Sequence, residues 1–170
     1  MPYIGFEGDY VELEDTIRDA MLFTIGNLQA GEVHLELGSG SGHFVTAARA
    51  AGAESYGWEI SPERYATSES QQYITLGDVL TNDLKANDIR GADLITFWWT
   101  DNSQGHLFDL MVKLYRNMRT PARLVCLMDS RREYRDGIEQ QINRNWNLDN
   151  EFWIPELTWV EGNLIHRFVR

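Results

Sequence analysis

The stretch that decides the fold runs from Val33 to Phe44 and reads VHLELGSGSGHF. An apolar strand pattern over 33–37 leads directly into three glycines at every second position. A helix pattern of small and apolar residues follows over 44–51. Because glycine permits a sharp turn and a close approach of a ligand to the backbone, this segment predicts the floor of a nucleotide-type cofactor site.

The composition is that of a globular protein of one domain. A chain of 170 residues with 43% hydrophobic and 24% charged residues can bury a real core. No apolar run is long enough to span a membrane, and residues 1–10 lack the pattern of a signal peptide. Cys126 is the single cysteine, which excludes an intramolecular disulfide and a thiolate metal cluster. We expect a cytoplasmic protein without a membrane partner.

The net charge of −11 and the pI of about 4.7 limit the possible partners. Nucleic acid is disfavoured because its phosphates would be repelled. The acidic balance suits a basic partner or a cationic cofactor, although it also serves solubility. The oligomeric state stays open.

Strand and helix patterns alternate along the chain. Besides the helix over 44–51, one helix pattern starts near Asp15 and ends at Gly31, another opens at Ser61-Pro62, and another starts near Ser103. Further strand patterns cover residues 55–60, 73–76, 92–99, 123–128, 152–160 and 164–169. This alternation predicts an α/β fold with three α-β-α layers. Its sheet is mostly parallel with seven strands, and Gly162-Asn163 predicts a C-terminal antiparallel hairpin.

Acidic residues stand where several of these strands end. Glu36 precedes the first glycine, Glu59 ends the second strand, and Asp78 follows the third. Ligands of open α/β sheets bind at these strand ends, where acids can accept hydrogen bonds from ribose hydroxyls and an adenine amino group or meet a cationic group. This set fits S-adenosylmethionine. NAD fits less well, because its G-x-G-x-x-G fingerprint needs glycine where this chain has His43.

Three motifs carry a family resemblance. ELGSGSG at 36–42 resembles motif I of the class I S-adenosylmethionine-dependent methyltransferases, GWEIS at 57–61 resembles the next motif, and LGDVL at 76–80 resembles the third. The resemblance implies a Rossmann-like core over 33–169, preceded by an N-terminal arm and helix over 1–31, in one domain over 1–170. It implies these cofactor-binding residues: Glu36, Gly38, Ser39, Gly40, Glu59, Ile60, Asp78 and Val79.

Other segments are similar to the small protein-lysine methyltransferases of archaea and mitochondria. They are DYVELED at 9–15, DLITFWW at 93–99 and IHRFVR at 165–170. In those proteins a tyrosine-bearing N-terminal segment folds over the cofactor, which implies that Tyr10 contacts it here. Glu12-Leu13 stands where those proteins tend to carry Pro-Thr.

The end of the fourth strand holds the candidates for the acceptor side. Trp98 is interpreted as a wall of the cofactor pocket and Trp99 as a catalytic candidate, with one of the pair expected in the core by strand alternation. Asp101 could orient or deprotonate an acceptor, or cap a helix. Arg131, Arg132 and Arg135 form a basic cluster, read as an anion site or as a solvated patch.

The histidines indicate structure more than chemistry. His34 is interpreted as a packed or edge histidine, and His43 as a residue that could approach the cofactor's carboxylate. His106 and His166 have no partners at metal-ligand spacing, so no metal site is predicted. The predicted function is methyl transfer from S-adenosylmethionine to an unidentified protein or small-molecule acceptor, such as a protein lysine. The alternatives are a non-catalytic S-adenosylmethionine-binding protein and a nicotinamide-dependent oxidoreductase.

Overall fold

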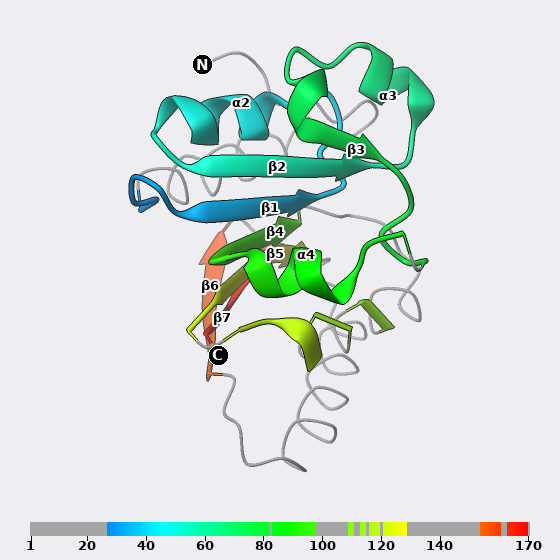
Figure 1. Cartoon of the computed structure of the whole chain (residues 1–170). Helices are drawn as coiled ribbons and strands as arrows, with labels where there is room; N and C mark the ends of the chain where they lie inside the picture. Colours follow the sequence, from blue (N-terminus) through cyan, green and yellow to red (C-terminus); the bar gives the residue numbers. More distant parts are fainter. Residues whose placement is uncertain are drawn as a thin grey trace.

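The structure is a computed structural model that describes residues 27–81, 83–97, 109–110, 113–114, 116–119, 121–128, 154–160 and 163–169. Its elements, drawn in Figure 1, are β1 (Val33–Leu37), α2 (His43–Ala50), β2 (Glu54–Glu59), α3 (Pro62–Ala66), the 3-10 helix η1 (Gln71–Tyr73), β3 (Ile74–Leu76), α4 (Ala86–Gly91), β4 (Leu94–Phe97), β5 (Arg123–Met128), β6 (Ile154–Val160) and β7 (Asn163–Val169). Residues 109–110, 113–114 and 116–117 are also helical.

Five strands form a parallel sheet in the order β3-β2-β1-β4-β5. This confirms the predicted α/β fold with a parallel sheet. β1 pairs with β2 on one side and with β4 on the other, with His34 opposite both Ser55 and Leu94. The strand order therefore reverses at β1, and ligands of such sheets bind beyond the carboxyl ends of the strands at this point. Beyond β5, the backbone of β7 pairs antiparallel with β5 and with β6.

Helices cover both faces of the parallel sheet. Successive residues of a strand point to opposite faces. On one face α2 buries Phe44, Val45 and Ala48, and the Phe44 ring contacts the His34 ring at 5.1 Å between centroids. The other face carries the main hydrophobic core, which combines strand, α4 and helical residues, among them Leu35, Leu37, Ile89, Ile95, Phe97, Leu110, Leu114 and Met118. Figure 1 shows α2 and α3 beside β2 and β3, and α4 in front of β4 and β5.

His34 is held inside the sheet by a hydrogen-bonded triad that crosses three strands. Its Nδ1 lies 2.7 Å from Oγ of Ser55 on β2, and its Nε2 lies 2.8 Å from Oγ1 of Thr96 on β4. All three side chains are fully buried. Burial lowers the pKa of His34 to about 3, so the ring is neutral at physiological pH. The prediction of a packed histidine is confirmed.

The strand and helix boundaries differ from the sequence prediction at a few places. β1 and β5 have the predicted bounds, whereas β2 begins and ends one residue earlier than expected. α4 was not predicted from the sequence, because Ile89 is its only buried side chain and the segment therefore shows no amphipathic period. No helix among the described residues has the length and hydropathy needed to cross a membrane.

Candidate functional site

The turn after β1 is built from glycines in the left-handed region. Gly38, Gly40 and Gly42 have φ of 75°, 57° and 77°. The N–H groups of Gly38 and Ser39 both donate to the carbonyl of Trp58, at 2.8 Å each, and Gly42 N–H donates to the carbonyl of Ser39 at 2.9 Å. Gly42 is the N-cap of α2. The turn is therefore fixed to the end of β2 as well as to β1.

The glycines of this region meet two different environments. A Cβ at Gly42 would lie 2.7 Å from Cδ1 of Ile74 and would also overlap Oγ of Ser68, and a Cβ at Gly57 would lie 2.7 Å from the side chain of Ser39. At Gly40 a Cβ would meet nothing within 4 Å. Close packing thus explains Gly42 and Gly57, whereas the backbone at Gly40 faces open space. That open position is where a ligand could approach the turn.

Glu59, the last residue of β2, connects the glycine turn after β1 to the segment that follows β2. Its Oε2 accepts the N–H of Gly40 at 2.6 Å, and its Oε1 accepts the N–H of Ser61 at 2.8 Å. The side chain is 3% exposed. An ionised carboxylate offers about four acceptor positions, and these two bonds use two of them. Each oxygen therefore keeps capacity for a further donor, and hydrogen bonds to a charged group are the strong ones.

Asp78 follows β3 and starts the loop that leads to α4. Its Oδ1 accepts the N–H of Leu80 at 2.9 Å, and its carbonyl accepts the N–H and the hydroxyl of Thr81 at 3.2 and 2.8 Å. The backbone N–H of Gly77 donates to the carbonyl of Glu59 at 2.9 Å. This bond places the ends of β2 and β3, and therefore both acids, at the same edge of the sheet.

The remaining candidates divide by where their side chains lie. Ile60 is 63% exposed beside Glu59. Val79 is 5% exposed within the main core, and the Ser39 side chain packs over Gly57 beneath α2. Among the described residues Ser39 Oγ has no hydrogen-bond partner. Glu36 is 2% exposed. A ligand at the turn would therefore meet the backbone of Ser39 and Val79, whose side chains face inward.

The acceptor-side candidates Trp98, Trp99 and Asp101, the arm residue Tyr10, and the cluster of Arg131, Arg132 and Arg135 lie outside the described residues. Their roles stay predictions. His43 is the first residue of α2 and is half-buried. Within the described ranges, no group of three His, Cys, Asp or Glu side chains is arranged to hold a metal ion.

Lys113 is a site residue that sequence reasoning missed. Its Nζ donates to the carbonyl of Thr81 at 2.7 Å and to the carbonyl of Val79 at 3.4 Å. Both carbonyls belong to the loop that carries Asp78. No local pattern could have revealed this contact, because 32 residues separate Lys113 from Thr81.

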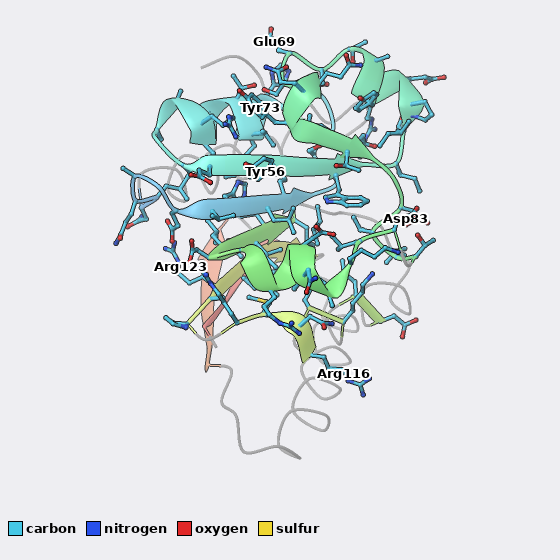
Figure 2. All side chains as sticks on the ribbon, in the orientation of Figure 1. Tyr56, Glu69, Tyr73, Asp83, Arg116 and Arg123 are labelled. Atoms are coloured by element: carbon cyan, nitrogen blue, oxygen red, sulfur yellow. The ribbon has the colours of Figure 1, made fainter. Side chains whose placement is uncertain are left out.

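These residues fit the adenosine part of S-adenosylmethionine. Glu59 has acceptor capacity for ribose hydroxyls, Asp78 stands at the neighbouring strand end for an adenine amino group, and Gly40 leaves room beside its backbone. Glu59 and Asp78 are both acidic, so they suit a ligand that carries no phosphate. Figure 2 shows Asp83 further along the loop after β3, on the same side of the sheet as this edge.

Comparisons with known proteins give matches in structure only. No protein-family model matches the chain, and no curated protein is similar to it in sequence. The ribosomal protein L11 methylase of Lactobacillus delbrueckii subsp. bulgaricus is a structural match with a TM-score of 0.69 and 19% identity, over 92% of this chain and 79% of that one.

Two other solved structures match this chain over most of both chains. Magnesium protoporphyrin IX methyltransferase of Synechocystis PCC 6803, with bound SAM, has a TM-score of 0.69 and 15% identity, over 98% of this chain and 86% of that one. An RNA methyltransferase of Salinibacter ruber, in complex with S-adenosyl-L-homocysteine, has a TM-score of 0.59 and 21% identity, over 90% and 89%. The chain therefore has the fold of the class I S-adenosylmethionine-dependent methyltransferases.

Proposed function

We propose that this protein is an S-adenosylmethionine-dependent methyltransferase. The observation that carries the proposal is the carboxylate of Glu59, which accepts the Gly40 N–H at 2.6 Å while two of its acceptor positions remain. An acid at the end of β2 that also orders the glycine turn is suited to hold the two hydroxyls of a ribose. The fold of the structural matches supports the same interpretation.

Each group of residues in the site would contact a different part of S-adenosylmethionine. The turn from Gly38 to Gly42 leaves open space beside Gly40, Glu59 would accept the ribose hydroxyls, and Asp78 would accept the adenine amino group. Ile60, which is 63% exposed, offers an apolar surface for the adenine ring. Bound S-adenosylmethionine supplies a methyl group that is already electrophilic because it is attached to a sulfonium.

The chain's own contribution to the reaction is alignment. Donor and acceptor must meet in line, and positioning of this kind can carry much of the rate. A general base is not required when the acceptor can lose its proton to water. Trp98 is proposed to form a wall of the cofactor pocket, Trp99 to act on the acceptor side, and Asp101 to orient the acceptor. Tyr10 is proposed to cover the cofactor.

The acceptor class that we propose is a protein amine, with a lysine side chain as the specific case. The net charge of −11 favours a basic protein over a nucleic acid. The structural matches include a ribosomal protein methylase, an RNA methyltransferase and a magnesium protoporphyrin IX methyltransferase. A single domain over 1–170, with a seven-strand sheet that ends in the β6–β7 hairpin, and a cytoplasmic location are parts of the same proposal. The antiparallel register of β5, β7 and β6 supports the hairpin.

Titration calorimetry with S-adenosylmethionine tests cofactor binding. Glu59→Ala should weaken binding by roughly 1–3 kcal/mol, because hydrogen bonds from the ribose to a charged group are lost. Glu63→Ala is the matched control, because it removes an exposed acid from the first turn of α3 and leaves the glycine turn after β1 unchanged. Glu59→Gln keeps the size of the side chain and should also bind weakly. Unchanged affinity in both Glu59 variants, or binding of NAD in place of S-adenosylmethionine, would contradict the proposal.

Radiolabelled S-adenosylmethionine identifies the acceptor class. The protein is incubated with the labelled compound and host lysate, and protein, nucleic acid and small-molecule fractions are counted. Label in lysine residues of the protein fraction is the expected result. Label in nucleic acid would contradict the acceptor that we propose. Binding without any turnover would make the chain a non-catalytic S-adenosylmethionine-binding protein.

A further inference from the structure

The loop between β3 and α4 carries Asp78 and is held mostly by short-range bonds. Leu80 N–H donates to Asp78, Thr81 N–H donates to the Asp78 carbonyl, and Asp83 N–H donates to Oγ1 of Thr81 at 3.2 Å. These bonds join residues two or three positions apart. They shape the turn locally, but they do not fix it relative to the rest of the sheet.

Two core side chains anchor the loop from below. Val79 is 5% exposed and Leu84 is 1% exposed, and both belong to the main hydrophobic core. Between them the loop is at the surface, where Leu80 is 38% exposed and Thr81 and Asp83 are exposed. Burial of these two side chains keeps the loop on the core, but hydrophobic contacts are not directional. The orientation of the Asp78 backbone therefore needs a further constraint.

Lys113 supplies a directional link to this exposed part. Its Nζ donates to the carbonyls of Thr81 at 2.7 Å and of Val79 at 3.4 Å. An ammonium group has three donor hydrogens and can bridge two carbonyls at once. Since Val79 and Thr81 are two residues apart, the lysine spans the turn that begins at Asp78.

The base of this lysine is rigid. Its neighbour Leu114 is fully buried, and Leu110 and Met118 lie one turn away on either side in the same core. The side-chain amide of Asn117 donates to the carbonyl of Lys113 at 2.8 Å. Lys113 therefore connects a core-anchored helical segment to the loop, rather than one mobile surface group to another.

The charges around Lys113 support the same arrangement. Burial lowers its pKa, and Lys85 acts in the same direction, whereas Asp78, Asp83 and Asp88 raise it. These three carboxylates favour the charged ammonium, but its hydrogen bonds go to carbonyl oxygens. This distinguishes it from an exposed ion pair, which would contribute little.

We propose that Lys113 is a positioning residue for cofactor binding, which holds the loop from Asp78 to Thr81 in the conformation that presents Asp78 to the adenine. The inference rests on the proposed function, because it concerns the same site. Lys113 acts through the loop and does not itself touch the cofactor.

The first experiment measures hydrogen exchange of the loop amides in the ligand-free full chain, so it does not depend on cofactor binding. Lys113→Met should raise the exchange rates of residues 80, 81 and 83 by about tenfold, because their opening no longer breaks the bonds to Nζ. Lys113→Arg should restore most of the protection, since a guanidinium also donates to carbonyls. Arg116→Met is the matched control, because Arg116 is exposed on the same helical segment and points away from the body in Figure 2. Unchanged protection in Lys113→Met, or an equal loss in Arg116→Met, would overturn the tether.

The second experiment separates positioning from general loss of stability. Lys113→Met should raise the Kd for S-adenosylmethionine by about five- to tenfold, and by less than about twofold when Asp78→Asn is already present. Independent, multiplicative effects would overturn the proposal, because they would show that Lys113 does not act through Asp78. If the wild-type protein binds no S-adenosylmethionine, the proposed function fails and the cofactor role of Lys113 fails with it, whereas the exchange experiment still shows whether the tether exists.

Discussion

The parallel sheet has an amino edge, where its strands begin, and a carboxyl edge, where they end. Charged side chains are arranged differently at these two edges. At the amino edge, charged side chains pair with one another: Arg123 with Glu32, and Arg119 with Asp93, which also accepts the Val33 N–H at 2.9 Å. At the carboxyl edge, the carboxylates of Glu59 and Asp78 accept backbone N–H groups of the surrounding turns. Figure 2 shows Arg123 near the edge where the strands begin.

This difference indicates which edge is prepared for a ligand. An acid that is paired with an arginine has its charge satisfied by the fold. An acid that accepts one or two N–H groups still has acceptor positions, and it orients the turn that a ligand would contact. The carboxyl edge therefore combines order with unused hydrogen-bonding capacity, whereas the amino edge serves stability.

The largest expected effect distinguishes two glycines of the same turn. Gly42→Ala should destabilise the protein by about 3–5 kcal/mol, because it adds a Cβ at positive φ where the fold leaves no room. Its closest neighbours are Ser68 and Cδ1 of Ile74, the latter at 2.7 Å. Thermal unfolding checks this loss.

Gly40→Ala is the comparison for this variant. Its φ is +57° and a Cβ meets nothing within 4 Å, so only the left-handed backbone is penalised, by about 1 kcal/mol. Its cost should appear instead as weaker S-adenosylmethionine binding, because the methyl group occupies the open space. Equal stability losses at Gly40 and Gly42 would show that the turn is not divided into a packed half and an open half.

The next largest effect is expected in the interior of the sheet, where His34 is buried with Ser55 and Thr96 between the amino and carboxyl edges. The folded protein lowers the pKa of His34 to about 3, whereas the unfolded chain has the ordinary value of 6.5. The unfolded state therefore binds more protons between these values, and stability falls as the pH drops below 6.5. The expected loss is roughly 1.4 kcal/mol per pH unit, or about 3 kcal/mol at pH 4.

His34→Gln provides the control for this slope. A glutamine amide can still reach hydroxyl partners, but it does not titrate. Urea unfolding at several pH values should show a shallower decline in the variant than in the wild type. Parallel curves would show that the acid loss comes from other groups.

Local sequence patterns were sufficient for much of the fold and for part of the site. The apolar run before Gly38, the Ser61-Pro62 helix start and the apolar strand pattern at 123–128 each have short-range signals, and all three elements are present. The positions of Glu59 and Asp78 follow from the same patterns, because an acid at the end of a parallel strand must lie at the carboxyl edge. Their binding roles remain predictions.

The rest depends on contacts that no local pattern encodes. α4 has a single buried residue, Ile89, and therefore no period. Lys113 reaches Thr81 only because the fold brings together segments that are far apart in sequence. The burial of Val79 in the main core depends on the packing of the loop against residues that are distant in sequence.

The smallest expected effect lies in the last turn of α2, where Arg49 stacks on Tyr73. Its guanidinium carbon lies 3.5 Å from the centroid of the Tyr73 ring and 5.6 Å from that of Tyr56, and its Nη1 donates to the carbonyl of Ser55 at 2.7 Å. Arg49→Lys keeps the charge but loses the planar stacking and should cost about 1 kcal/mol of stability. Arg64→Lys, at an exposed position of α3, is the matched control. Because Arg49 lies at the end of α2 opposite to Gly42, S-adenosylmethionine affinity should stay within about twofold of the wild type, the limit expected for distant, independent sites. A larger loss of affinity would mean that this structural contact is coupled to the carboxyl edge, and that the division between structural and binding regions is wrong.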